Sequence, residues 1–264
     1  MSLFKGFRGI ARITRANGSY LFFRFTSADV GLTQDLNAFL PSYGGSGLYR
    51  IVSPKVGEIG GRISLLLGSK VADIFYEIAY SAEEVILDLT YRDGNSRNYT
   101  GVKFNQLSFS CKAGEIVQVN IDLVAKTYSK NTSALKWTGT DKLVTWDKSG
   151  FTGVMVGQDA QSFTYSIENN LVINRTAASL LPYAINNGIQ KVSGNIVWFD
   201  SISPMTETSA ARRNAMLVTQ ATFWIDSFAV THGIAHHWTY RAPLSPDLLV
   251  TTLDWTMVTD VEAT

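Results

Sequence analysis

The sequence is poor in the features that define several common classes of protein. Its one cysteine, Cys111, excludes a disulfide within the chain. No apolar run reaches the roughly 18 residues that a membrane-spanning helix needs, so we expect no membrane insertion. The opening residues, MSLFKGFRGIARITRANG, are interrupted by basic side chains and lack the continuous apolar core of a signal peptide. These absences predict a protein of cytoplasmic origin.

An excess of charge of one sign is also missing. Lysine and arginine total 23 and aspartate and glutamate total 22, which gives a net charge of +1 at pH 7. A protein that reads nucleic acid is usually clearly basic, so this balance argues against that function. The 264 residues are 45% hydrophobic and 17% charged, a composition typical of a globular protein with one large or two small domains.

Residue types that commonly perform catalysis or bind metals form no recognisable pattern in this sequence. His232, His236 and His237 are the only histidines, and they lie in THGIAHHWTY, whose composition favours a strand and a turn. No acidic or cysteine ligand is adjacent to them, so we expect structural or surface histidines. Glu83 and Glu84 are neighbours and would point to opposite sides of a strand, which excludes a catalytic pair. We therefore predict that the protein is not an enzyme and has no catalytic residue, cofactor or metal site.

The clearest pattern is a long β-hairpin over residues 99–128. Apolar and polar side chains alternate along both arms, and a period of two puts the apolar set on one face of a strand. The turn is predicted at residues 112–115, and a change of phase before Gln106 predicts a β-bulge near Asn105. Cys111 belongs to the apolar face, so we expect a buried and unreactive thiol. The apolar set contains Leu107, Phe109, Val117, Val119, Ile121 and Leu123, and the polar set contains Gln118, Asn120 and Asp122.

Residues 69–80 change from a period of two to the period of a helix. Ser69 is predicted as the N-cap of this helix. Its apolar stripe is expected to cover an open end or face of the β core. A second, weaker helix is predicted at residues 208–217, around three alanines. The apolar stripe of the first helix contains Val71, Ile74, Phe75 and Ile78, at positions i, i+3, i+4 and i+7.

The two halves of the chain resemble each other. Residues 59–63, IGGRI, match residues 192–196, VSGNI, and both halves are predicted to run strand, helix, long hairpin. We interpret this as an internal duplication. The predicted fold is mainly β, with two related β-sandwich or barrel halves that each carry a long hairpin and a short flanking helix. The predicted boundaries are 1–130 for the first half, 131–150 for a linker and 151–264 for the second half.

The hairpin sequence TGVKFNQLSFSCKAGEIVQVNIDLVAK resembles the closing hairpin of bacteriophage tail tube proteins. Residues 162–171, SFTYSIENNL, and residues 189–196 are similar to the opening of the second half in longer members of that family. The resemblance implies a structural subunit that self-assembles into stacked rings, which form the conduit for DNA during genome ejection. Two alternatives stay open. One is another tail component, such as a baseplate hub, distal tail or tube-terminating protein, and the other is a carbohydrate-binding β-sandwich or β-rich enzyme.

The resemblance also implies a role for each predicted face. The apolar set would support an assembly hairpin, the polar set Gln118, Asn120 and Asp122 would line the lumen, and the helix would lie at the core or a subunit boundary. The expected partners are further copies of the chain, the tape measure protein and double-stranded DNA in the lumen and, in a contractile tail, a sheath. The expected location is the virion tail, with assembly in the cytoplasm of the bacterial host.

The resemblance further implies the number of chains in a ring. Subunits of this family that contain one sandwich form six-fold rings. A chain with two sandwich halves would supply two of those positions, which predicts homotrimeric, pseudo-hexameric rings. The alternative is a homohexamer in which the second half decorates the outside.

Overall fold

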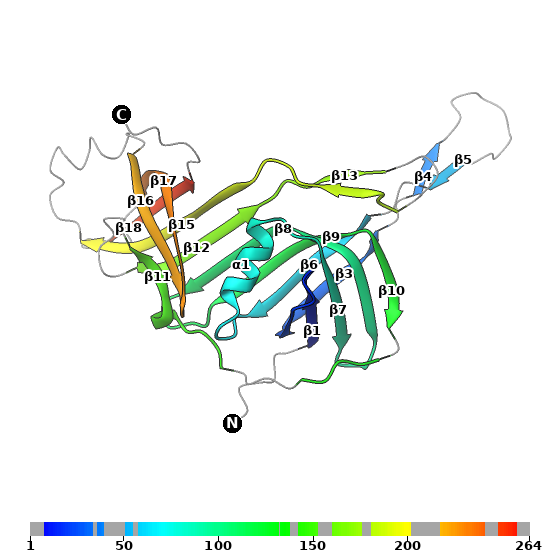
Figure 1. The fold of residues 1–264 in the computed structure, drawn as a ribbon. Helices are drawn as coiled ribbons and strands as arrows, with labels where there is room; N and C mark the ends of the chain where they lie inside the picture. The colour runs from blue at the N-terminus through cyan, green and yellow to red at the C-terminus, as the bar shows by residue number, and fades with distance from the viewer. Residues whose placement is uncertain are drawn as a thin grey trace.

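A computed structural model (Figure 1) describes residues 8–33, 36–39, 51–54, 58–131, 133–137, 142–152, 160–175, 181–201, 217–240 and 248–257. Within these residues the fold is mainly β, as predicted, with one α-helix, α1 (Ala72–Tyr80), and one short 3-10 helix, η1 (Trp146–Lys148). The helix predicted at residues 208–217 lies outside the described residues except for Leu217, which begins a strand.

Most of the strands belong to one sheet of 14 strands. From the first half of the chain it contains β1 (Gly9–Thr14), β2 (Tyr20–Phe25), β3 (Ser27–Thr33), β6 (Glu58–Leu66), β7 (Val85–Tyr91), β8 (Ser96–Lys112), β9 (Gln118–Ala125) and β10 (Thr127–Asn131). From the second half it contains β11 (Ser149–Thr152), β12 (Ala160–Glu168), β15 (Lys191–Ser201), β16 (Leu217–Ile225), β17 (Phe228–Tyr240) and β18 (Leu248–Met257). Two small sheets pair β4 (Leu36–Phe39) with β5 (Ile51–Pro54) and β13 (Val172–Asn174) with β14 (Ala184–Asn186).

Strand β8 joins the two halves of the main sheet. Its first part pairs with β7 and β10, and its last part pairs with β12 and β9. The register against β9 shifts between Phe104 and Gln106, so the bulge predicted near Asn105 is present. A bulge bends its strand, and here it separates the part of the sheet that contains β1, β2 and β7 from the part that contains β6, β9 and β12.

The predicted hairpin is confirmed as β8 and β9 with their connecting turn. Leu107 faces Ile121 and Phe109 faces Val119 across the two strands. All four of these side chains, together with Val117, have no exposed surface, and Leu123 is 2% exposed. Cys111 is also buried, as predicted, and burial raises the pKa of its thiol to about 11, so the reactive thiolate is absent at neutral pH.

Helix α1 lies across one face of the main sheet (Figure 1), and one continuous hydrophobic core contains side chains of α1 and of strands from both halves. From α1, Phe75 and Ile78 are fully buried, and Phe75 meets Phe23 of β2 edge to face with ring centroids 5.2 Å apart. From the second half, Tyr165 stacks on Phe223 with centroids 4.2 Å apart. Packed aromatic pairs of this kind add to the stability gained by burial alone.

Helix α1 is shorter than the sequence predicts. It begins at Ala72, and its N-cap is Val71, which makes no side-chain cap. The prediction of Ser69 as the cap is wrong, because the Ser69 hydroxyl donates to the Asp226 carboxylate at 2.7 Å instead. Ile74 and Val71 of the predicted stripe are only half-buried and pack at the margin of the core.

The two halves of the sheet have the same strand order. The first half runs β3–β6–β9–β8–β7 across the sheet and the second runs β12–β15–β18–β17–β16. Helix α1 separates β6 from β7 in the chain, and residues 202–216, between β15 and β16, lie outside the described residues. Gly61 and Gly194, which the sequence comparison aligned, occupy matching strands. At both, a Cβ atom would strike a backbone oxygen of the preceding strand, that of Asp29 or of Thr164.

The predicted linker, residues 131–150, is held to the body of the protein where it is described. Val144 is 3% exposed within the core, and its backbone exchanges hydrogen bonds with Leu67 and Val117. From Ser149 onward the chain forms β11, which pairs with β16. In addition, β12 pairs with β8, so the two predicted halves share one sheet.

Substitution of the hairpin tests this assignment of faces. Ile121→Asp would bury a carboxylate that has no partner, so we expect a loss of several kcal/mol of unfolding free energy, roughly 4, or failure to fold. Asn120→Ser is the matched control, because Asn120 lies on the other face and Ser can replace its contact with Ser64. Thermal unfolding of both variants gives the comparison. A stable Ile121→Asp protein would mean that the faces are reversed.

Candidate functional site

The face of the main sheet opposite α1 is covered by small polar side chains, and we call it the polar face. One row crosses the sheet in register, and none of its members is buried. Within the row, the Ser64 hydroxyl donates to the Asn120 side chain at 2.7 Å. In strand order the row contains Ser27, Ser64, Asn120, Ser108, Ser166, Ser193 and Thr256.

A second row on the polar face carries alternating charge. In strand order it contains Asp29, Arg62, Asp122, Gln106, Glu168 and Lys191. Arg62 donates two hydrogen bonds to Asp122, at 2.6 and 2.7 Å, and the hydrogen bond to this carboxylate raises the pKa of Arg62. Asp29 and Glu168 flank these charges. Within the row the acidic side chains outnumber the basic ones, so it forms no basic cluster.

The predicted lumen residues Gln118, Asn120 and Asp122 all lie on the polar face, and none is buried. The predicted assembly residues lie beneath them. Leu107, Phe109, Val117, Val119, Ile121 and Leu123 are enclosed within the single chain. These side chains are therefore not available for contact with another subunit. Any role that they have in assembly is indirect, because they stabilise the sheet whose surface would make the contact. That role stays a prediction.

Among the described residues, the polar face reaches an edge of the sheet at β3. Strand β3 pairs with β6 and with no other described strand. Strand β17 pairs with β16 only as far as His236, while its pairing with β18 continues to Tyr240. The residues before Leu217, which would continue β16 beside residues 237–240, lie outside the described residues.

Behind the sheet, an aromatic cluster lies between β12, β17 and α1. The Tyr165 hydroxyl and His232 Nε2 are 2.7 Å apart, and Tyr76 and Tyr80 of α1 lie against the histidine ring. His232 is 9% exposed, and burial lowers its pKa below the ordinary value. Its surroundings are those of a structural histidine, as the sequence analysis expected, but the pairing with Tyr165 had no signal in the sequence.

Asn169 fixes the end of β12 to the first half. Its side chain is buried and donates to the backbone oxygens of Ala79 and Phe104, both at 2.8 Å. Its carbonyl oxygen accepts from the Gln190 side chain, also at 2.8 Å. A buried amide whose groups are all bonded is costly to replace, so this contact holds α1, β8 and β12 in one arrangement.

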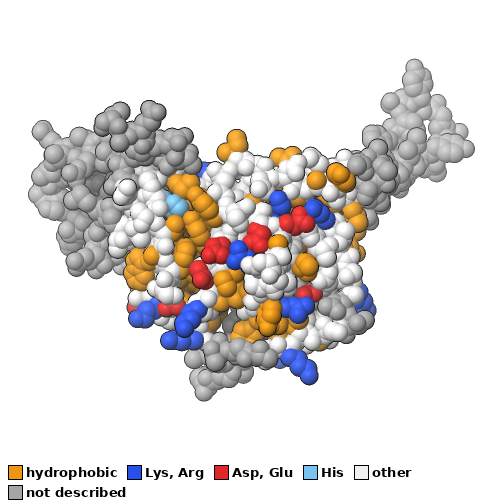
Figure 2. Space-filling view, in the orientation of Figure 1, with side chains coloured by type: hydrophobic (Ala, Val, Ile, Leu, Met, Phe, Trp, Pro, Cys, Tyr) orange, Lys and Arg blue, Asp and Glu red, His pale blue; other side chains and the backbone are white. Residues whose placement is uncertain are grey.

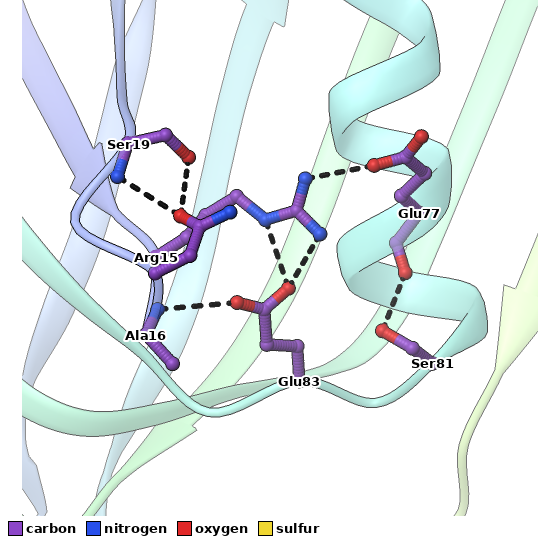
Figure 3. Close-up of polar contacts among 7 residues, drawn as sticks. Arg15, Ala16, Ser19, Glu77, Ser81 and Glu83 are labelled. Carbon is purple, nitrogen blue, oxygen red and sulfur yellow. Dashed lines mark hydrogen bonds and ion pairs between the residues drawn. The ribbon is translucent and has the colours of Figure 1, made fainter.

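Arg15 ties the β1–β2 turn to α1 (Figure 3). Its guanidinium reaches Glu77 at 2.7 Å and Glu83 at 2.8 Å, and Glu83 also accepts from the Ala16 backbone. The neighbouring Glu84 accepts from Lys126 instead, at 2.6 Å. The two adjacent carboxylates are thus engaged in separate ion pairs, although they precede β7 and do not lie on a strand as the prediction assumed.

The charged side chains of the described surface are mixed and form no metal-binding group. On the side that carries α1, acidic and basic side chains are interspersed (Figure 2). No three His, Cys, Asp or Glu residues in the described ranges gather as a metal site. No helix among the same residues is long and apolar enough to cross a membrane.

The burial of His232 makes stability depend on pH. The folded pKa lies below the unfolded value of about 6.5, so the unfolded chain binds more protons as pH falls through that value. Unfolding free energy should therefore decrease from about pH 7.5 to about pH 5.5. His232→Gln keeps an acceptor for Tyr165 and should show a weaker dependence. Denaturant titrations of both proteins across this range give the difference, and parallel curves would contradict the prediction.

Residues 88–198 match a family model described as phage tail tube protein. This segment runs from β7 to β15, so it includes the long hairpin, the β8–β12 contact and much of the polar face. The resemblance predicted from the hairpin and from SFTYSIENNL is confirmed over this segment. No curated protein matches the chain.

Proposed function

We propose that this chain, a phage tail protein by the family match of residues 88–198, is the repeating subunit of a tail tube. In this function, copies assemble into rings, the rings stack, and the enclosed lumen conducts DNA during ejection. The observation that carries the proposal is the polar face, a broad surface of hydroxyl and amide groups on one side of a sheet that is apolar on the other.

The chemistry of the polar face suits a conduit for DNA. A DNA duplex binds surfaces mainly through contacts between its phosphates and basic side chains. Here Arg62 is engaged by Asp122, and Asp29 and Glu168 add further negative charge to the same row. In this row three acidic side chains outnumber Arg62 and Lys191, so a wall of this kind holds water and offers phosphates few basic side chains to bind. The same lumen would contain the tape measure protein before ejection.

The proposed outside of the tube is the surface around α1 and the outer side of β7, which the bulge of β8 separates from the strands of the polar face. Ile86 on β7 points away from the core and is 41% exposed, while its neighbours Val85 and Leu87 are buried. A contractile tail would add a sheath around this outer surface. The protein would be a structural component without enzymatic activity, assembled in the host cytoplasm and located in the virion tail.

The ring would contain three chains. The matching strand orders of the two halves support an internal duplication, with β3–β6–β9–β8–β7 and β12–β15–β18–β17–β16 as its two units. The β8–β12 contact already joins the two units side by side within one chain. Three such chains supply six units to a closed, pseudo-hexameric ring.

Thiol labelling tests whether the polar face lines the lumen. The only native thiol, Cys111, is buried and should not react. Gln118→Cys places a thiol on the polar face, and Ile86→Cys is the matched control on the outer face. A large polyethylene-glycol maleimide should modify both thiols in dissociated subunits but only Ile86→Cys in assembled tubes. Equal labelling of the two variants in tubes would contradict a luminal polar face.

The copy number is tested separately. Native mass spectrometry of rings released from tubes, or a cross-section by electron microscopy, should give three chains per ring and six similar lobes. Six chains per ring would overturn the trimer and leave the tube function in place. A chain that stays monomeric at every concentration and ionic strength would overturn the tube function itself.

A further inference from the structure

The chain contains one completed joint between its two units. In this joint β12 of the second unit pairs with the last part of β8, and α1 of the first unit packs against the same side of the second unit. Tyr76 lies against Phe228 with ring centroids 4.9 Å apart, and Tyr80 stacks on His232 at 6.4 Å. Beneath these rings, the Tyr165 hydroxyl and His232 are bonded to each other. The side of the second unit that carries β12 is therefore covered by the first unit.

The strand registers identify the counterpart of Tyr165 in the first unit. Gly61 and Gly194 occupy matching positions on β6 and β15. On the preceding strand of each unit, Gly61 faces Val30 and Gly194 faces Tyr165. Val30 on β3 therefore holds the position that Tyr165 holds on β12.

The same registers assign His232 to Tyr99. Followed from the two glycines through β9 and β18, they match Val102 of β8 with Ile234 of β17. The match continues through β7 and β16 to the residues that face Tyr99 and His232. Strand β8 contains one extra residue between Tyr99 and Val102, at a register shift where Gly101 has a positive φ of 62°. Tyr99 and His232 thus occupy the same position in the two units.

The first unit repeats the contact between these positions. The Tyr99 hydroxyl donates to the Val30 backbone oxygen at 2.9 Å, and Arg97 donates to the same oxygen at 3.2 Å. Tyr128 of β10 lies against Tyr99 with ring centroids 6.2 Å apart. We call Arg97, Tyr128 and the neighbouring edge of β3 the β3 side. It is the counterpart, in the first unit, of the side that α1 covers in the second unit.

The β3 side is exposed where its counterpart is covered. The Arg97 side chain is exposed and Tyr128 is 44% exposed, whereas His232 is 9% exposed beneath the rings of α1. The guanidinium of Arg97 lies 5.9 Å from the centre of the Tyr91 ring, so its orientation is set before any partner binds. Arginine and tyrosine are the residue types that often dominate the binding energy of protein interfaces.

We propose that the β3 side binds the second unit of another copy of this chain, and so repeats between copies the joint that lies within the chain. The proposal rests on the tail tube function and names the subunit contact of that tube. The β12 side is occupied by the first unit of the same chain, so of the two equivalent sides the β3 side is left for another copy.

The position of the β3 side agrees with assembly into rings. In Figure 1, β10 lies at the end of the molecule opposite to β16, β17 and β18 of the second unit. A contact between the β3 side of one copy and the second unit of the next therefore joins unlike surfaces, head to tail. Contacts of this type close into rings when the rotation between neighbours permits.

Site-specific photo-cross-linking tests which surface meets another copy. The photoreactive residue p-benzoylphenylalanine is introduced in place of Tyr128, and in place of Tyr20 as the control. Tyr20 is 66% exposed and lies on β2, on the face directed away from the core. Illuminated tubes should give covalent dimers from position 128 and none above background from position 20. Dissociated subunits should give dimers from neither position.

Mass spectrometry of the digested dimer should place the cross-link in residues 151–264 of the second copy. A link in residues 1–130 of the second copy, or tubes that give no dimer from position 128, would overturn this contact and leave the tube function standing. Failure of the unmodified chain to assemble would overturn both.

Substitutions give an independent measurement of the same contact. Arg97→Gln and Tyr128→Ala should each raise the subunit concentration needed for assembly about tenfold, while Tyr20→Ala leaves it unchanged. Thermal unfolding of dissociated subunits identifies any variant that fails to fold. Arg97→Gln should fold even if Tyr128→Ala does not, because the Val30 oxygen keeps its bond from Tyr99. Assembly of either folded variant at the concentration of the unmodified chain would overturn the contact.

Discussion

The pairing of β8 along both of its edges is the constraint on which the rest of the structure depends. No other described strand joins the part of the sheet that contains β7 to the parts that contain β9 and β12. Its bulge at Asn105 bends the strand, so its first part pairs with β7 and its last part pairs with β9 and β12. The buried side chains of β8 then bring α1 and the aromatic groups of β12 into one core. The polar face exists because this core occupies the other side.

The ends of the β8–β12 joint are held by groups from distant parts of the chain. Asn169 bonds to the last turn of α1 and to β8 at one end. At the other end, the Ala113 amide bonds to the Gln161 oxygen. These contacts make the relation between the two units rigid within a chain. In the proposed ring of three chains, three of the six contacts between units would lie within a chain and would form when the chain folds. Only the other three contacts would depend on the concentration of subunits.

The sequence predicted the parts of the fold that depend on local periodicity. The alternation from Leu107 to Leu123 gave the hairpin and its buried face, because a strand with one wet and one dry side requires a period of two. The predicted start of α1 was wrong because the Ser69 hydroxyl donates a hydrogen bond to Asp226 instead of capping the helix. Asp226 is distant in the sequence, and no local pattern indicates that it lies near Ser69. The polar residues of β12 alternate as clearly as those of β9. However, they belong to the same polar face as the residues of β9 only because β12 pairs with β8, and this pairing joins segments that are distant in the sequence.

The contacts of Asn169 and His232 could not be predicted from the sequence either, because their partners are distant along the chain. Asn169 was visible only as part of SIENNL, with no indication that its amide would reach Ala79 and Phe104. The histidines were expected to be structural or surface residues, and His232 is buried, but its partner Tyr165 lies on another strand. The short match between residues 59–63 and 192–196 also gave no information on the order of strands in the sheet, which is the same in the two halves among the described strands.

The row that runs from Ser27 to Thr256 has a consequence for movement past the wall. Its side chains are similar in size and hydrogen-bonding capacity, and they recur at each strand, about 4.8 Å apart. In the proposed tube, a polyanion that slides along such a surface would meet nearly the same energy at every position, with no deep minimum in which to stall. Friction would then come from the viscosity of the intervening water, and this friction and the driving pressure together would set the speed of transit.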